Sequence, residues 1–259
     1  MESKFTLETD LSQDRFYMSF PALSSSIFGE DEDTHKFDKL HEMVKSTHLF
    51  KSPRIFYIKG GNGYGKSTIP LMMAQSDPDY FHVIDRETSS TLFTIYPNFN
   101  TAVLGPYHKG KTFGGGDSLK QEDLSVAFSL MYDGLGIIDS ENLSFYFEGS
   151  IISTTKSTYF DMLLEHDERN SVCLFIDVPK NILIDRMRLR TGKTSDQIES
   201  LKHFEDKINR IERAKVYYTE QLSLHESKSH VEVLQIDNTC DKSKYFMNFI
   251  LGKFDEVVV

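Results

Sequence analysis

The sequence lacks several features that would point to a membrane protein or a disulfide scaffold. No apolar run approaches the roughly 20 residues that cross a bilayer, and the first ten residues lack the basic and apolar regions of a secretory signal. The two cysteines, Cys173 and Cys240, do not have the spacing of a metal site, and Cys173 lies in an apolar run. We therefore expect a cytoplasmic protein with free thiols and no membrane partner.

Basic residues are also scarce relative to acidic ones. The 39 Asp and Glu residues outnumber the 29 Lys and Arg residues, which gives a formal net charge of −10. A negative overall field does not steer a protein to nucleic acid, which argues against a non-specific DNA coat. The net charge does not exclude an enzyme with a locally basic site. The hydrophobic fraction of 39 % is sufficient for a sizeable core.

The chain divides into two regions by composition. Residues 1–53 are polar and acidic, and we predict an N-terminal arm with a helical stretch that starts near Asp33. In residues 54–259, strands and helices alternate, which predicts an α/β domain with a parallel sheet. The predicted strands are 55–58, 81–84, 143–147, 172–178 and 231–236, and 90–104 is β-rich without a clear division. The predicted helices are 67–75, 119–131, 157–165, one opened by Pro179, 195–222 with a capping box at 194–197, and 245–254.

The most specific motif is a glycine-rich loop between a predicted strand and a predicted helix. Residues 60–67, GGNGYGKS, match G-x-x-x-x-G-K-[ST] in full. Glycines let successive backbone N–H groups surround a phosphate, Lys66 can reach the β- and γ-phosphates, and the Ser67 hydroxyl can ligate Mg²⁺. The predicted cofactors are therefore ATP and Mg²⁺. The candidate cofactor-binding residues are Gly60, Gly61, Asn62, Gly63, Tyr64, Gly65, Lys66, Ser67 and Thr68.

Two carboxylates follow predicted strands, where open parallel sheets bind their ligands. Asp85 ends one strand and Glu148 another. Either could organise Mg²⁺ or accept a proton from the acceptor hydroxyl, and either could simply cap a turn. Glu148 is the candidate metal residue together with Ser67, and both acids are candidate catalytic residues.

A basic segment follows the fourth strand. Arg186 and Arg190 share one face of a helix that ends near Gly192. Guanidinium groups suit phosphate oxygens, so the segment predicts a lid that closes over ATP, with both arginines as catalytic candidates. The alternative is a solvated basic face.

The loop from Gly105 to Asp117 combines lysines, aromatics and three consecutive glycines. Aromatic rings such as that of Phe113 can stack on a base and lysines can meet phosphate, although a plain surface loop fits equally well. The candidate substrate-binding residues are Arg86, Tyr107, Lys109, Lys111, Gly115, Gly116 and Asp117.

The order of these segments resembles the small P-loop kinases of the nucleoside-monophosphate kinase type. The resemblance covers about residues 54–255. It implies a parallel five-stranded sheet with helices on both faces, and a transfer of the γ-phosphate of ATP to a hydroxyl group.

Three short motifs also resemble a narrower family, the bacteriophage kinases that phosphorylate 5-hydroxymethyluracil in DNA. These motifs are residues 105–107, 114–117 and 148–149. The resemblance implies a hydroxymethyl acceptor near Asp85, Asp117 and Glu148, and a host cytoplasm as the location.

Other functions remain open at this point. The acceptor could be a free nucleotide or another small molecule. A nucleotide-dependent switch or assembly ATPase is a second class, but no Asp-Glu pair follows the strand that ends at Glu148, as would be usual in motor-type ATPases. A non-catalytic nucleotide-binding scaffold is a third. The sequence does not fix the oligomeric state.

Overall fold

A computed structural model describes most of the chain after residue 53. The described residues are 5–9, 54–77, 80–85, 87–107, 115–133, 143–149, 152, 158–165, 170–201, 203–225, 230–239 and 242–256. The chain divides into two compact units. The first includes β1 (Phe5–Thr9) and residues 69–146, and the second comprises residues 54–68 and 147–259. The predicted helix near Asp33 lies outside the described residues. The division into an arm and a kinase domain stays a prediction.

The second unit is built on three parallel strands. β2 (Arg54–Lys59) pairs with β7 (Asn170–Asp177), and β7 pairs with β8 (Val231–Asp237), while the short β9 (Asp255–Glu256) runs antiparallel to β8. The interiors of β2 and β7 are almost fully buried, as expected for parallel strands that are covered on both faces. The five predicted strands are all present, three of them in this unit.

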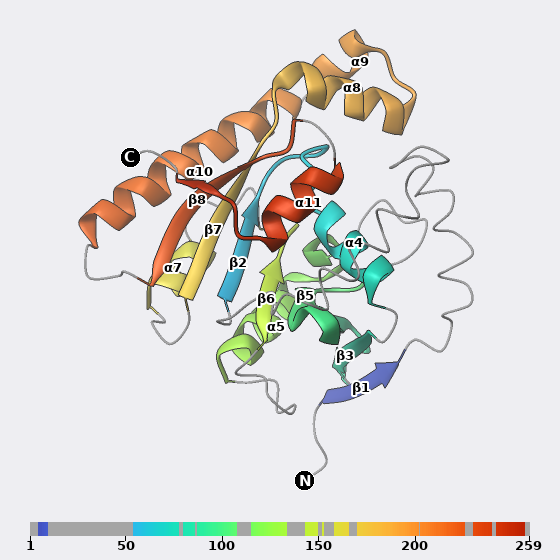
Figure 1. The fold of residues 1–259 in the computed structure, drawn as a ribbon, viewed down its shortest axis with the longest axis vertical. Coiled ribbons are helices and arrows are strands. Elements are labelled where there is room, and N and C mark those ends of the chain that lie inside the picture. Colours follow the sequence, from blue (N-terminus) through green and yellow to red (C-terminus); the bar gives the residue numbers. More distant parts are fainter. Residues whose placement is uncertain are drawn as a thin grey trace. The chain divides into compact units, whose positions relative to one another are not determined.

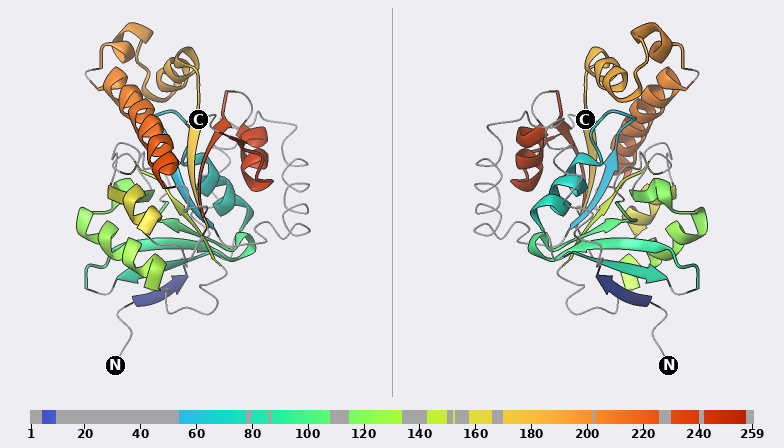
Figure 2. Two further views of the ribbon diagram at one scale, coloured as in Figure 1. Left: turned by 90° about the vertical axis from the view of Figure 1, so that its left-hand side faces the viewer. Right: turned by 90° about the vertical axis from the view of Figure 1, so that its right-hand side faces the viewer.

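Helices cover both faces of this parallel sheet. Figure 2 shows α10 (Phe204–Leu224) and α11 (Lys242–Ile250) on opposite sides of the strands. The inner face of α10 buries Tyr218, whose ring stacks on that of Phe160 in α7 (Thr158–Glu165) with 3.8 Å between the centroids. This aromatic layer fixes α10 and α7 against the sheet.

The helical segment after β7 differs from the prediction of one long helix at 195–222. α8 (Lys180–Thr191) ends at Gly192, which has a left-handed φ of 68°, and α9 (Ser195–Glu199) follows. The capping box at Thr194 and Gln197 is confirmed. The helical conformation is then interrupted, and α10 begins at Phe204. Because the apolar spacing continues through Ile198, Leu201 and Phe204, periodicity could not reveal the break.

The first unit is largely antiparallel. β3 (Phe81–Asp85) pairs with β1 and β4 (Thr91–Tyr96), and β4 pairs with β5 (Thr101–Leu104), all antiparallel. Only β6 (Ser144–Phe147) runs parallel to its neighbour β5. Two 3₁₀ turns, 97–99 and 115–118, α5 (Gln121–Asp133) and residues 69–76 of α4 (Thr68–Ser76) complete the described helices and strands of this unit (Figure 1).

The α/β class is confirmed, and the predicted parallel five-stranded sheet is confirmed only in part, because antiparallel strands accompany the parallel ones. Residues 81–104 form an antiparallel meander, because the connections after β3 and β4 are too short for a crossover helix. The remaining predicted helices match α4 (Thr68–Ser76), α5, α7 and α8 closely. α11 ends at Ile250, earlier than predicted, and Gly252 follows it with a φ of 63°. Among the described residues, no helix is long and apolar enough to cross a membrane.

Candidate functional site

The glycine-rich loop lies between β2 and α4 and has the strained backbone that its glycines permit. Gly63 and Gly65 have φ angles of 84° and 88°, in the left-handed region that favours glycine. A Cβ on Gly65 would lie 2.1 Å from the side-chain amide nitrogen, Nδ2, of Asn238. The loop conformation therefore depends on glycine at this position, both for its backbone angles and for the close approach of a neighbouring side chain.

Lys66 lies over the loop that precedes it. Its Nζ donates a hydrogen bond to the carbonyl of Gly61 at 3.0 Å, and its side chain is largely buried. The backbone N–H of Thr68 donates to Gly65 O at 2.9 Å, where the chain enters α4. The loop thus combines a helix start, a lysine ammonium and several backbone N–H groups, which together favour a bound phosphate.

The structure brings Ser67 and Glu148 together. The Ser67 hydroxyl donates a hydrogen bond of 2.9 Å to Glu148 Oε1, although the two residues lie 81 positions apart. Glu148 follows the last residue of β6 and is 2 % exposed. The two predicted metal residues therefore form one oxygen-rich pair next to the phosphate loop.

This pair suits Mg²⁺ better than a soft metal. Mg²⁺ is commonly held by one or two protein oxygens and completes its octahedron with phosphate oxygens and water. The described residues contain no group of three or more His, Cys, Asp or Glu side chains that could hold a metal by themselves. A serine hydroxyl and one carboxylate fit a metal that arrives with a nucleotide.

Arg186 and Asn238 hold the outer side of the loop. Arg186 donates to the carbonyl oxygens of Gly63 (3.2 Å) and Asn238 (2.6 Å). The Asn238 side chain is buried and its Nδ2 donates to Tyr64 O at 2.7 Å. Arg186 therefore contacts the backbone of the glycine-rich loop, and its predicted catalytic role stays a prediction.

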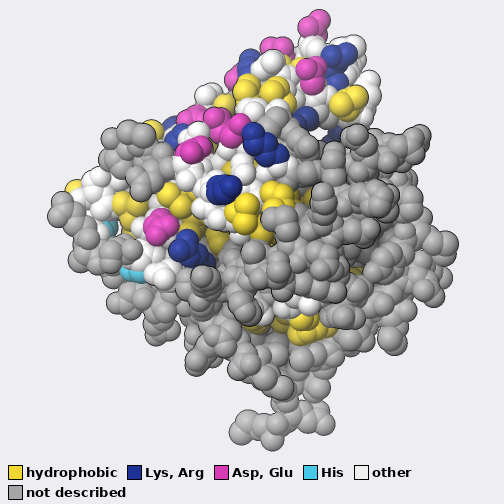
Figure 3. Space-filling model, in the orientation of Figure 1, with side chains coloured by type: hydrophobic (Ala, Val, Ile, Leu, Met, Phe, Trp, Pro, Cys, Tyr) yellow, Lys and Arg dark blue, Asp and Glu magenta, His cyan; other side chains and the backbone are white. Residues whose placement is uncertain are grey.

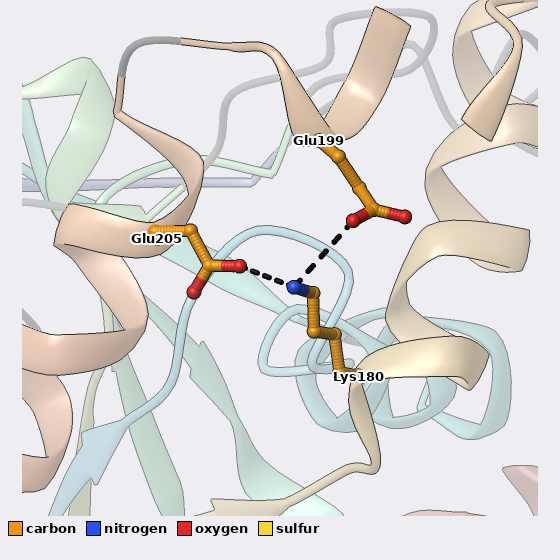
Figure 4. Close-up of polar contacts among 3 residues, drawn as sticks. All are labelled: Lys180, Glu199 and Glu205. Carbon is orange, nitrogen blue, oxygen red and sulfur yellow. Dashed lines mark hydrogen bonds and ion pairs between the residues drawn. The ribbon is translucent and has the colours of Figure 1, made fainter. Parts of the chain in front are cut away.

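Arg190 lies in the last turn of α8, where its side chain is exposed. The base of this helical segment is tied together by Lys180, which pairs with Glu205 and, at 3.6 Å, with Glu199 (Figure 4). The hydrogen bond from Lys180 to Glu205 raises the pKa of the lysine. This exposed cluster joins the starts of α8 and α10 to the end of α9, and the function of the segment as a lid stays a prediction.

A buried lysine immediately precedes the phosphate loop. Lys59 Nζ donates to the carbonyl of Ile152 at 2.6 Å and to the hydroxyl of Tyr57 at 3.0 Å. It also lies over the rings of Tyr57 and Tyr218, 4.3 Å and 5.1 Å from their centroids. Burial lowers the pKa of Lys59 to about 7, and burial raises the pKa of the neighbouring Cys173 thiol. Lys59 thus fixes the segment that follows Glu148.

Asp85 lies in the first unit and caps the turn after β3. Its Oδ1 accepts hydrogen bonds from the N–H groups of Glu87 (2.8 Å) and Thr88 (3.4 Å), and the residue is 2 % exposed. The capping role that the sequence left open is therefore present. A catalytic role for Asp85 stays a prediction.

The glycine-rich loop of the first unit is closed at its base. Gly115 N donates to Pro106 O at 3.3 Å, and Thr94 Oγ1 donates to Gly105 O at 3.0 Å. A Cβ on Gly105, which has a φ of 74°, would lie 2.3 Å from Gly115 O. The glycines thus allow two backbone segments to touch.

The other acceptor-side candidates have different surroundings. Tyr107 and Gly116 are buried in the first unit, while Asp117 is exposed in the 3₁₀ turn. The candidates Arg86, Lys109, Lys111 and Phe113 lie outside the described residues. Their roles in substrate binding remain predictions.

Asn238 and Lys59 are the site residues that the sequence analysis missed. Asn238 directly follows β8, so the rule that ligands meet the carboxyl ends of parallel strands could have singled it out. Lys59 was visible as a charged residue at the end of an apolar strand, directly before the loop. Neither signal identifies the carbonyl groups that these side chains contact.

Charge on the second unit is mixed where it can be seen. Figure 3 shows acidic and basic side chains interspersed among the described residues of this face, with no continuous basic stripe. The described side chains of this view therefore do not form the local basic patch that a protein of net charge −10 would need in order to bind nucleic acid.

Comparisons with known proteins agree with one another. A family model described as "5-hmdU DNA kinase" matches residues 35–228. The chain is 32 % identical over 164 residues to "5-hmdU DNA kinase 1" of Salmonella phage ViI, a match that covers 58 % of this chain and 70 % of that protein. It is also 32 % identical over 148 residues to "5-hmdU DNA kinase" of Bacillus phage SP10, covering 55 % of this chain and 22 % of that longer protein. No solved structure matches the chain.

Proposed function

Because the chain belongs to the 5-hmdU DNA kinase family, we propose that it transfers the γ-phosphate of ATP to the hydroxymethyl oxygen of 5-hydroxymethyluracil in DNA. The family supports the acceptor and the reaction class. The proposal adds ATP as the donor, Mg²⁺ as the metal and named residues for each task. The phage origin of the relatives supports action in the cytoplasm of an infected cell.

The observation that carries the residue assignment is the hydrogen bond between Ser67 and Glu148 beside the phosphate loop. In the proposed reaction the loop N–H groups and Lys66 bind the β- and γ-phosphates, and Ser67 with Glu148 would hold the metal against the same oxygens. Bound Mg²⁺ would neutralise part of the negative charge on the phosphates. The loop and Lys66 would stabilise the rest as it develops in the transition state.

The transfer itself is an exchange of one oxygen–phosphorus bond for another. The hydroxymethyl oxygen bonds to the γ-phosphorus, the bond from this phosphorus to the β-phosphate oxygen breaks, and ADP leaves. The hydroxyl proton passes to a carboxylate. Because Glu148 already accepts from Ser67, we assign it to the metal, and we assign the proton to Asp85 or Asp117.

A transfer assay with several acceptors tests this proposal. Labelled phosphate from ATP would be followed into DNA that contains 5-hydroxymethyluracil, into matched thymine DNA, and into free deoxynucleotides. We expect label only in the modified DNA. Equal label in a free nucleotide would make the protein a nucleotide kinase, and ATP hydrolysis that no acceptor stimulates would favour a switch or assembly ATPase.

A further inference from the structure

The outward-facing carbonyl groups of the phosphate loop have dedicated partners. A loop that surrounds a phosphate with its N–H groups must direct the corresponding carbonyl oxygens away from it, and buried carbonyls need donors. The Tyr64 carbonyl accepts a hydrogen bond from Asn238 Nδ2 at 2.7 Å, and the Gly63 carbonyl accepts one from Arg186 Nη1 at 3.2 Å. Both partners come from elements that lie more than 100 residues later in the chain.

The planarity of the peptide bond turns these contacts into a constraint on the donors. In a trans peptide, the C=O of one residue and the N–H of the next point in opposite directions. Holding the Gly63 carbonyl toward Arg186 therefore directs the N–H of Tyr64 the other way, and this N–H donates to the carbonyl of Gly61 at 3.4 Å within the loop. Holding the Tyr64 carbonyl toward Asn238 likewise directs the N–H of Gly65 away from Asn238.

Asn238 is itself held in place on several sides. Its backbone N–H donates to Asp177 O at 3.0 Å, and its backbone carbonyl accepts from Arg186 Nη2 at 2.6 Å. The side chain is buried, and only a glycine at position 65 leaves room for it. A residue that is held by this many contacts keeps its position before a ligand binds, so Asn238 is preorganised.

We propose that Asn238 is a positioning residue that aims the N–H of Gly65 at the nucleotide phosphates, and that Arg186 supports it by donating to the carbonyl oxygens of Asn238 and Gly63. The inference rests on the proposed function for the identity of the ligand. It adds a role for Asn238 and a specific action for Arg186, which works here through the loop backbone.

The test uses the full chain and MgADP, which needs no acceptor. Asn238→Ala removes the donor to Tyr64, and we expect the Kd for MgADP to rise at least about fivefold, as loss of one hydrogen bond predicts. Asn98→Ala is the matched control, because its amide donates to Asp77 Oδ1 at 2.9 Å within the first unit. The control should change the Kd by less than about twofold.

A second readout separates positioning from a general loss of structure. In spectra of ¹⁵N-labelled protein, the Gly65 amide should shift on MgADP binding in the parent and in Asn98→Ala, and its shift should shrink in Asn238→Ala. DNA affinity should stay at the parental value. Parental MgADP affinity in Asn238→Ala would overturn the proposal, and so would an equal loss of MgADP and DNA affinity.

Arg186→Gln keeps the proposal testable if Asn238→Ala does not fold, because Arg186 is only partly buried. Here the shift of the Gly65 amide on MgADP binding should shrink, because Arg186 holds the backbone carbonyl of Asn238, and an unchanged shift would contradict the inference. A parent that binds MgADP as described but fails to phosphorylate modified DNA would refute the proposed function alone.

Discussion

The two units of the chain hold their candidate functional residues in different ways. In the second unit, Lys66, Ser67, Glu148 and Arg186 all have hydrogen bonds that lead to or from the phosphate loop. In the first unit, the described candidates differ: Asp85 caps a turn, Asp117 is exposed, and Tyr107 and Gly116 are buried. The candidates of the second unit thus share contacts with the glycine-rich loop, while the described candidates of the first unit do not share one contact partner.

The largest expected effect concerns the glycine-rich loop of the second unit. Lys66→Ala should lower phosphate transfer more than about a hundredfold, about 2.7 kcal/mol in activation free energy, because the ammonium that meets the β- and γ-phosphates is lost. Steady-state transfer assays measure this, with thermal unfolding as the check that the fold persists. Transfer within about tenfold of the parent would refute the assignment of the loop.

A second substitution tests the partner of Ser67. Glu148→Gln keeps the size of the side chain but removes its charge, so we expect the chemical step to slow about a hundredfold while the Kd for ATP changes less than about threefold. Single-turnover kinetics at saturating ATP and DNA separate the two quantities. A parental rate would leave Glu148 with only a capping role.

Two glycines with similar backbone angles allow a matched test of crowding in the first unit. Gly105 and Gly192 have φ angles of 74° and 68°, but a Cβ would meet Gly115 O only at position 105, and would have open space at position 192. We expect Gly192→Ala to lower the free energy of unfolding by about 1 kcal/mol. Gly105→Ala should cost about 3 kcal/mol or more in urea unfolding. Equal costs would mean that the loop base can open without penalty.

The pH dependence of stability tests the buried lysine. Burial lowers the pKa of Lys59 from 10.5 to about 7. Between these values the unfolded chain binds one more proton than the folded chain, so this residue makes stability rise with pH from about 7 to 10.5, by up to about 1.4 kcal/mol per unit. Lys59→Met should remove that rise and stabilise the protein most at neutral pH.

Urea unfolding at several pH values between 7 and 10.5 measures the effect. The exposed Lys253 supplies the control, since Lys253→Met should leave the parental slope unchanged. The Ile152 carbonyl keeps a donor in the Lys59→Met variant, because the Tyr57 hydroxyl lies 3.2 Å from it. Identical slopes in the parent and Lys59→Met would show that the lysine keeps its charge in the folded state.

The smallest expected effect concerns the acceptor side. Replacing Lys109 and Lys111 with Ala should weaken DNA binding and reduce the slope of log affinity against log salt by up to about two units, since each phosphate contact contributes about one. ATP affinity should stay the same, because the phosphate loop is a separate element. A steep slope that survives the double substitution would place the basic contacts elsewhere.

The sequence predicted the features that short segments determine. The capping box at Thr194, and the strand and the helix that flank the glycine-rich loop, follow from local patterns, and the structure has them. The antiparallel direction of β3 was missed, since an alternation of strands and helices does not encode which strand pairs with which. The contacts of Asn238 and Lys59 were missed for a related reason: each joins residues more than 90 positions apart.

The proposed reaction of this chain is phosphorylation of the hydroxymethyl group of 5-hydroxymethyluracil in DNA. The most direct measurement is mass spectrometry of nucleosides released from modified DNA after incubation with the protein, ATP and Mg²⁺, beside matched thymine DNA. We expect phosphorylated 5-hydroxymethyldeoxyuridine among the nucleosides from the modified DNA. This product should be absent when the Lys66→Ala variant replaces the parent. Unchanged nucleosides, or phosphate found equally in thymine DNA, would contradict the proposed reaction.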